Sequence, residues 1–343
     1  MAITMETIAK EAGVCRETVS FIFNNRCKER RISEETRDRV LSIAEKHNYL
    51  PSSTGRSLVK KKTHNIGVSL HSVEYLTQTY FSTIIGGIAH QVGLQDYNMQ
   101  FEVTDSSGES SKNMYFLKKA KGKFIDGIII IDQKVSDSEI LKLKDMNIPF
   151  VLVDRYIPGA DVFCVRVDNE KGIYLSTEHL IKRGHKRIAF VCEYIKWNKI
   201  IDMFKGYYSA LKDYGISSDK ELIIDVTGWD VSNKVSTELE RIFKIASPPT
   251  AIVCSSDLSA VKVLRILKEM EIMVPRDMAL VGYNDDPNFI HVEPQLTTVN
   301  IPLREMGEES ARMIFSLIGG VVPERSEVIV EPTLIVRQST AFI

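Results

Sequence analysis

The sequence has no apolar run of about 18 residues, which a membrane-spanning helix would need. Its N-terminus also lacks the charged start and apolar stretch of a secretory signal. We therefore expect a cytoplasmic protein with no membrane partner. Cysteine is scarce: the five residues are odd in number, lie far apart and form no C-x-x-C pair with a histidine partner. This spacing supports neither a disulfide framework nor a zinc site, and we expect no metal and no cofactor.

Motifs for catalysis are missing as well. The chain contains no G-x-S-x-G nucleophile turn, no phosphate-binding G-x-x-x-x-G-K-[ST] loop and no H-E-x-x-H zinc motif. Carboxylates do cluster after several apolar runs, but a binding cleft at strand ends explains them. We therefore predict no catalytic residues, and a binding protein rather than an enzyme.

Charge is distributed unevenly along the 343 residues. The formal net charge of −1 taken whole argues against a nucleic-acid partner, yet residues 1–62 carry 13 Lys and Arg against 8 acidic residues, a net of +5. The rest of the chain carries 31 against 37. A basic head on a mildly acidic body is typical of a DNA-binding module joined to a sensor domain. The length fits a small module followed by a two-lobed α/β domain.

The stretch from Met5 to Asn24 has the pattern of two short helices around a turn. Apolar residues at helical spacing stand on both sides of the turn: Ile8, Ala9 and Ala12 before it, and Val19, Ile22 and Phe23 after it. Gly13 supplies the helix stop between them. In a helix-turn-helix, the N-terminal side chains of the second helix enter the major groove. Here these would be Cys15, Arg16, Glu17 and Thr18.

These residues resemble the DNA-binding headpiece of the LacI/GalR family of bacterial repressors. The matching positions are Thr4, Ile8-Ala9, Ala12-Gly13-Val14, Thr18-Val19-Ser20 and Asn24, followed by Ile32–Arg37, Asn48–Pro51 and Arg56–Leu58. The resemblance implies three domains: a headpiece at 1–51, a hinge helix or linker at 52–62, and a two-lobed effector-binding and dimerisation domain at 63–343. It implies as partners a double-stranded DNA operator, a small-molecule effector and a second copy of the chain.

Ten residues are candidates for contacting DNA: Thr4, Arg16, Glu17, Thr18, Ser20, Phe21, Asn24, Arg26, Arg56 and Leu58. Arg16 suits guanine and Glu17 suits cytosine N4, so we expect these two to read base edges. Phe21 either touches a thymine methyl group or packs. The loop after Asn24 is basic, and we expect it to contact phosphates. Leu58 is either a minor-groove wedge or a plain linker residue, and Gly55, where the family usually has alanine, weakens the hinge helix.

From Asn65 onward, short apolar runs alternate with helical segments. The runs are Ile66–Leu70, Met99–Val103, Gly127–Ile131, Phe150–Val153, Ile188–Val191, Ala251–Cys254 and Ala279–Gly282. This order predicts parallel sheets that are buried on both faces. The stretch Val165–Asn169 divides the series into two halves, and Thr297–Asn300 returns the chain across. The predicted fold class is therefore α/β, with a small all-α headpiece and a two-lobed, periplasmic-binding-protein-like body.

In such a body the ligand lies between the lobes, at the carboxyl ends of the strands. Polar or aromatic residues after the strands are therefore the candidates for effector binding: Tyr80, Gln133, Asp154, Lys196, Trp229, Ser256, Asn284 and Asp285. Trp229 either stacks on the ligand or packs in the core. Asp257, beside Ser256, either contacts the ligand or caps the next helix.

Two positions depart from what the resemblance implies. Met203 stands where the family usually has a ligand-binding arginine, and Asn284 stands where it usually has an aspartate. A sugar or sugar derivative therefore remains one candidate, and a molecule with fewer hydroxyl groups, or a charged one that meets Lys196 or Arg155, is the other. The function expected is a ligand-responsive transcriptional regulator, most simply a repressor. The alternatives are a solute-binding protein with a basic head and, more remotely, an enzyme acting on the cleft ligand.

Overall fold

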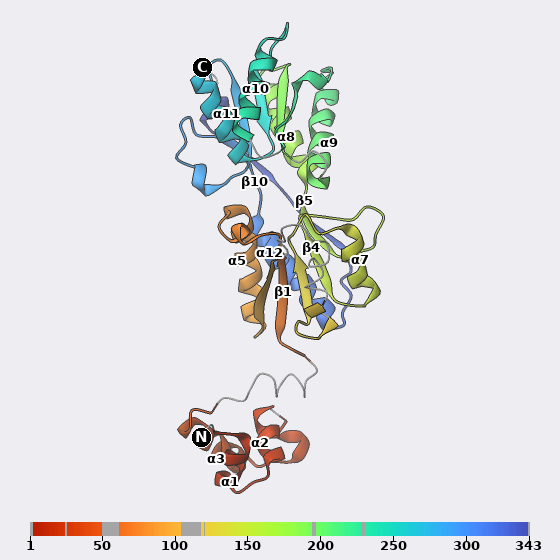
Figure 1. Cartoon of the computed structure of the whole chain (residues 1–343), viewed down its shortest axis with the longest axis vertical. Coiled ribbons are helices and arrows are strands. Elements are labelled where there is room, and N and C mark those ends of the chain that lie inside the picture. The colour runs from red at the N-terminus through yellow and green to blue at the C-terminus, as the bar shows by residue number, and fades with distance from the viewer. Residues whose placement is uncertain are drawn as a thin grey trace. The chain divides into compact units, whose positions relative to one another are not determined.

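The computed structural model describes two compact units, Met1–His64 and Asn65–Ile343, which are called here the headpiece and the body (Figure 1). The described residues are 3–24, 26–49, 62–103, 118–119, 121–193, 197–227 and 231–341. None of the helices in these ranges is long and apolar enough to cross a membrane.

The headpiece consists of short helices around one small core. Its elements are α1 (Met5–Ala12), α2 (Arg16–Phe23), the 3₁₀ turn η1 (Lys28–Arg30) and α3 (Glu34–Lys46). The Thr4 hydroxyl accepts a hydrogen bond from the backbone N–H of Thr7 and starts α1, and Gly13 ends it with a φ of 67°. Glycine adopts this left-handed conformation without steric cost, so the chain turns sharply into α2. The apolar faces meet in one cluster: Ile8, Ala9, Ala12, Val19, Ile22, Val40 and Ala44.

The body has two lobes, each built on a six-stranded sheet. The N-lobe sheet has the order β11-β5-β4-β3-β1-β2 with every pair parallel. Its strands are β1 (Asn65–Leu70), β2 (Asn98–Val103), β3 (Gly127–Ile130), β4 (Phe150–Val153), β5 (Cys164–Val167) and β11 (Glu327–Val330). The helical elements of this lobe are η2 (Val73–Leu76), α5 (Thr79–Leu94), α7 (Asp137–Asp145) and α12 (Leu303–Ile318).

The C-lobe repeats this design in the order β12-β10-β9-β8-β6-β7, with only β10 and β12 antiparallel among the pairs described. Its strands are β6 (Ile188–Cys192), β7 (Ile223–Asp225), β8 (Ala251–Cys254), β9 (Ala279–Asn284), β10 (Thr297–Asn300) and β12 (Thr333–Ile335). Its helices are α8 (Asn169–Lys182), α9 (Asn198–Asp213), α10 (Val231–Phe243) and α11 (Asp257–Glu269), with the 3₁₀ turns η3 (Lys220–Leu222), η4 (Pro287–Phe289) and η5 (Gln338–Thr340).

The chain passes between the lobes after β5, after β10 and after β11 (Figure 1). The predicted α/β class, with an all-α headpiece and parallel sheets in two lobes, is confirmed. All seven predicted runs form strands, and the division at 165–169 and the return at 297–300 are also found. Three strands were not predicted, namely β7, β11 and β12. They are edge strands that are only partly buried, so none of them stands out as a buried apolar run in the sequence.

Each lobe contains one pair of helices that approach closely at glycines. In the N-lobe, a Cβ atom on Gly87 of α5 would overlap the carbonyl oxygen of Arg304 in α12, and one on Gly307 would overlap the carbonyl oxygen of Ile84. In the C-lobe, a Cβ atom on Gly206 of α9 would overlap the carbonyl oxygen of Glu170 in α8. Since a side chain at these positions would force the helices apart, the glycines set the packing distance within each lobe.

Two neighbouring glycines of α5 provide a test of this packing. Gly87→Ala should lower the free energy of unfolding of the body by about 1–3 kcal/mol, because the added methyl group overfills a closed contact. Gly86→Ala is the matched control, since Gly86 is exposed and its Cβ would meet nothing within 4 Å. That variant should gain up to about 1 kcal/mol from helix propensity. Equal effects of the two variants in urea unfolding would contradict the close packing of α5 and α12.

Candidate functional site

The exposed face of α2 carries the side chains predicted to read DNA bases. Val19 and Ile22 are buried in the headpiece core, so Arg16 and Glu17 point away from it and are exposed. The pKa of Glu17 is lowered, first by a hydrogen bond from its own backbone N–H and then by Cys15. Glu17 is therefore ionised near neutral pH and presents only hydrogen-bond acceptors.

The smaller polar candidates hold the helix ends together. Thr4 caps α1 as described above, and the Thr18 hydroxyl lies 3.2 Å from the Cys15 sulfur at the start of α2. At the other end of α2, Asn24 Nδ2 donates to the backbone oxygen of Ser20 over 2.7 Å. These contacts fix where α2 begins and ends and leave room for DNA to approach its exposed face.

The remaining DNA candidates are in or beyond the loop that follows α2. Arg26 donates from both Nε and Nη2 to Glu29 Oε2, over 2.8 and 2.6 Å. The Phe21 ring is half-buried and lies beneath the guanidinium group of Arg26. Arg56 and Leu58 lie outside the described residues.

In the body, two of the predicted effector candidates are in direct contact: Tyr80 and Asp154, which follows β4. The Asp154 side chain is 5% exposed and its backbone has a φ of 52°. The Tyr80 hydroxyl, at the start of α5, donates to Asp154 Oδ2. Burial and the neighbouring carboxylate raise the pKa of Tyr80 well above its usual range, so this hydroxyl keeps its proton. Asp154 Oδ1 is buried and has no hydrogen-bond partner within the described ranges.

Lys199 completes this cluster from the opposite lobe, and the sequence analysis missed it. Its Nζ lies 3.4 Å from Asp154 Oδ2 and 4.7 Å from the centroid of the Tyr80 ring. Lys199 belongs to the first turn of α9 in the C-lobe, whereas Asp154 and Tyr80 belong to the N-lobe. Lys199 stands one turn before Met203, and this spacing was the signal available in the sequence.

A second group of polar residues follows β9 in the C-lobe. Asn284 and Asp285 have φ values of 115° and 54°, which L residues adopt at a cost. Asp285 is paired with Arg337 over 2.7 Å, whereas Asn284 Oδ1 is buried and has no partner in the described part of the chain. A pocket of about 590 Å³ is lined by both residues together with Tyr80 of the N-lobe. The pocket therefore opens between the lobes.

Asp257, next to Ser256 at the start of α11, supports the loop that follows β9. The Ser256 hydroxyl caps α11 by accepting from the backbone N–H of Ser259 over 3.1 Å. Asp257 is buried and accepts hydrogen bonds from the Thr298 hydroxyl at 2.6 Å and from the backbone N–H of Asp286 at 2.8 Å. Burial raises the pKa of Asp257, although these two hydrogen bonds act against the rise. Asp257 thus positions the residues after β9.

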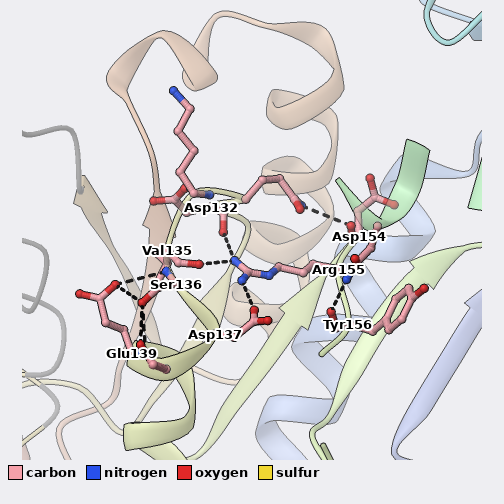
Figure 2. A network of polar contacts seen from close by, with 12 residues as sticks. Asp132, Val135, Ser136, Asp137, Glu139, Asp154, Arg155 and Tyr156 are labelled. Carbon is pink, nitrogen blue, oxygen red and sulfur yellow. Dashed lines mark hydrogen bonds and ion pairs between the residues drawn. The ribbon is translucent and has the colours of Figure 1, made fainter. Parts of the chain in front are cut away.

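Gln133 and Arg155 stabilise the strand ends of the N-lobe. Gln133 Nε2 lies 3.3 Å from the backbone oxygens of Val153 and Asp154. Figure 2 shows the Arg155 guanidinium directed away from Asp154 towards the residues before α7. It donates to the carbonyl oxygens of Val135, over 2.6 Å, and Asp132, over 3.3 Å, and it pairs with Asp137. Its donors are therefore used within the N-lobe.

The two positions that depart from the usual residues of the family, Met203 and Asn284, have different surroundings. Met203 is fully buried in the main hydrophobic cluster of the body. Asn284, by contrast, lines the pocket between the lobes. Lys196 and Trp229 lie outside the described residues.

Further contacts join the lobes around the Asp154 cluster. Asn198 Nδ2 donates to the backbone oxygen of Tyr156 over 2.9 Å, and the Tyr156 hydroxyl donates to Asp202 over 3.2 Å. On the other side, Asn288 Nδ2 donates to the Thr79 hydroxyl. Among the residues described, no group of three His, Cys, Asp or Glu side chains could hold a metal ion. The arrangement is a polar cleft between two lobes that touch at several points.

Comparison with known proteins covers both units. The sequence profile of the bacterial regulatory proteins of the lacI family matches residues 4–52, and that of the periplasmic binding protein-like domain matches residues 177–340. The HTH-type transcriptional regulator RegA of Clostridium saccharobutylicum is 30% identical over 344 residues, which cover 99% of this chain and 100% of RegA. The chain belongs to the LacI family of bacterial regulatory proteins.

Other LacI-family relatives agree with this assignment. The HTH-type transcriptional repressor PurR of Aliivibrio salmonicida is 27% identical, over 98% of each chain. The structure of the transcriptional regulator CelR in complex with cellobiose is similar, with a TM-score of 0.73 and 25% identity over 98% of this chain and 100% of CelR. The chain is therefore a transcriptional regulator, and the solute-binding alternative is disfavoured because the similarity includes the helix-turn-helix.

The buried position of Asp154 leads to a stability prediction. Tyr80→Phe should lower the free energy of unfolding of the body by about 1.5–3 kcal/mol, because a buried carboxylate loses a hydrogen bond from a neutral donor. The control is Tyr214→Phe, which removes the same kind of bond, to Glu178 over 2.9 Å, at an exposed position. This control variant should lower the free energy of unfolding far less. Equal losses in denaturant unfolding would show that Asp154 is not buried as described.

Proposed function

We propose that this regulator represses transcription by binding a near-palindromic DNA operator as a homodimer, and that a small polar effector in the interlobe cleft changes its operator affinity. One observation carries the proposal: the same chain joins a headpiece with an exposed, polar α2 face to a two-lobed body with an interlobe pocket that is lined by Asn284, whose buried Oδ1 has no partner in the described residues. Since an operator is chromosomal, we place the protein in the cytoplasm, and turnover of the effector is no part of its role.

In this proposal the exposed face of α2 enters the major groove. Arg16 would donate in a bidentate manner to guanine, and the ionised Glu17 would accept from cytosine N4. Thr4, Thr18, Ser20 and Asn24 would contact the backbone and set the register of the helix. Arg56 and Leu58, in the linker at 52–62, would contact the minor groove, with Leu58 as the wedge that bends the site.

A two-fold operator requires two headpieces, and features of the body support a second copy of the chain. Phe101 and Val103 are exposed on β2, which is the edge strand of the N-lobe sheet. Exposed apolar side chains on an edge strand favour burial against another surface. Dimerisation through the body would supply the two headpieces that an operator of two half-sites needs.

For the effector, the polar groups of the cleft indicate a molecule rich in hydrogen-bond donors. Asp154 Oδ1 and Asn284 Oδ1 are buried acceptors without partners in the described residues, and a buried acceptor is costly unless it is paired. CelR binds cellobiose according to its structure, which supports a sugar or a sugar derivative. Ser256, Gln133, Asp285, Lys196 and Trp229 remain candidates for further contacts.

The DNA-binding role is tested by operator selection from random duplexes with the full-length chain. The unmodified protein should enrich one near-palindromic consensus, and its affinity should fall steeply with salt as counterions are released. Arg16→Ala should relax the consensus at one position by about 1–3 kcal/mol. Arg37→Ala, on the exposed side of α3, is the control and should leave the consensus unchanged. Equal affinity for selected and random duplexes would refute the proposal.

The effector role is tested by calorimetry across a panel of simple sugars. Because Asn284 lines the cleft where the family usually has an aspartate, Asn284→Asp should raise sugar affinity from a weak starting level. Adding Met203→Arg should raise it further if the folded state tolerates the charge, which thermal unfolding of the double variant reports. Tight sugar binding by the unmodified protein that is lost in Asn284→Asp would mean that these positions have the opposite role.

A further inference from the structure

Two arginines of the loop after α2 lie over one aromatic ring of the recognition helix. The guanidinium carbon of Arg30 is 4.9 Å from the centroid of the Phe21 ring, and that of Arg26 is 5.5 Å away. Phe21 stands one turn after Glu17 on the exposed side of α2. The loop therefore brings positive charge to the helix face that carries Glu17.

The loop is held in this position by the headpiece core. Cys27 and Ile32 pack against the buried cluster, and Ile32 N donates to the carbonyl oxygen of Cys27 over 3.0 Å. Arg26 N donates to the carbonyl oxygen of Phe21 over 2.9 Å. The turn η1 lies between these anchors and ends at Arg30. Because both ends of the turn are fixed, the Arg30 side chain starts from a defined position beside the ring.

The two arginines differ in what else they contact. Arg26 Nε and Nη2 both donate to Glu29 Oε2, over 2.8 and 2.6 Å. Arg30 is exposed, and within the described part of the chain its side chain makes no hydrogen bond or ion pair besides its contact with the ring. A guanidinium group that lies on an aromatic face keeps the N–H groups along its edge available. Arg30 is thus the arginine with free donors.

We propose that Arg30 reads a guanine in the major groove and that the Phe21 ring positions it. This inference rests on the proposed binding of α2 in that groove. Phe21 is four residues beyond Glu17, about 6 Å along the helix, so the base pair contacted by Arg30 adjoins those contacted by Arg16 and Glu17. The planar fork of an arginine matches guanine O6 and N7, a fit that lysine does not offer.

The rival role for Arg30 is a contact with the DNA backbone. Phosphate contacts carry no sequence information and lower affinity for every duplex alike when they are lost. Lys28 is the internal reference for this behaviour, since it is an exposed cation in the same turn. The two roles therefore predict different changes in the selected consensus.

The experiment is selection from random-core duplexes with the full-length chain and with Arg30→Lys, Phe21→Leu, the double variant and Lys28→Ala. Arg30→Lys keeps the charge and removes the fork, whereas Phe21→Leu keeps an apolar side chain and removes the ring. Each should reduce the preference for guanine at the same half-site position by at least about fivefold. The double variant should lose no more than either single variant. Lys28→Ala should weaken binding to all duplexes and keep the consensus.

An unchanged consensus in Arg30→Lys, or a loss shared equally by all duplexes, would overturn the inference and leave the proposed function standing. A consensus altered by Phe21→Leu alone would assign the reading to the ring itself and would also overturn it. If the unmodified chain enriches no consensus, the proposed sequence-specific DNA binding is refuted, and the inference about Arg30 is refuted with it. Thermal unfolding of every variant separates these outcomes from misfolding, and the exposed Arg30→Lys substitution should leave the melting temperature unchanged.

Discussion

The buried carboxylate of Asp154 is the interaction on which the body depends. A carboxylate removed from water must be paired or hydrogen-bonded, and the partners of Asp154 come from two lobes, with Tyr80 on one side and Lys199 on the other. Only Oδ2 is used in this way, and Oδ1 has no partner in the described residues. Through its contact with Lys199, Asp154 therefore joins the two lobes at the end of β4.

Each lobe contains a closely packed pair of helices. Helices α5 and α12, and likewise α8 and α9, approach so closely at glycines that neither pair can slide without a clash. The described contacts between the lobes, by contrast, include single polar bonds such as those from Asn198 and Tyr156. The main buried hydrophobic cluster also contains residues of both lobes, so apolar packing joins the lobes together with these polar contacts.

Much of this arrangement could be predicted from the sequence, because its signals are local. The glycine at 13, the helical spacing around it and the apolar runs of the body depend only on near neighbours. Lys199 was missed, because its spacing from Met203 indicates only a shared helix face, whereas its contact with Asp154 arises when α9 of one lobe meets the end of β4 of the other. The position of Arg30 over Phe21 likewise depends on a loop anchored by Cys27 and Ile32 in the core. Arg155 shows the opposite case: its position after a strand predicted that it could meet a charged ligand, yet its guanidinium points away from Asp154.

The central claim, that closure of the cleft controls the headpiece, can be tested without knowing the effector. Thr79 and Asn288 are bonded across the lobes, so a short thiol crosslinker on the pair Thr79→Cys and Asn288→Cys would hold the cleft closed. The measurement is the affinity of the full-length chain for a selected operator, by fluorescence anisotropy, before and after crosslinking, with each single variant as the control for the native thiols. A coupling of about 1–3 kcal/mol predicts a change of at least about fivefold in the crosslinked pair alone. Unchanged operator affinity in the locked protein would contradict the account.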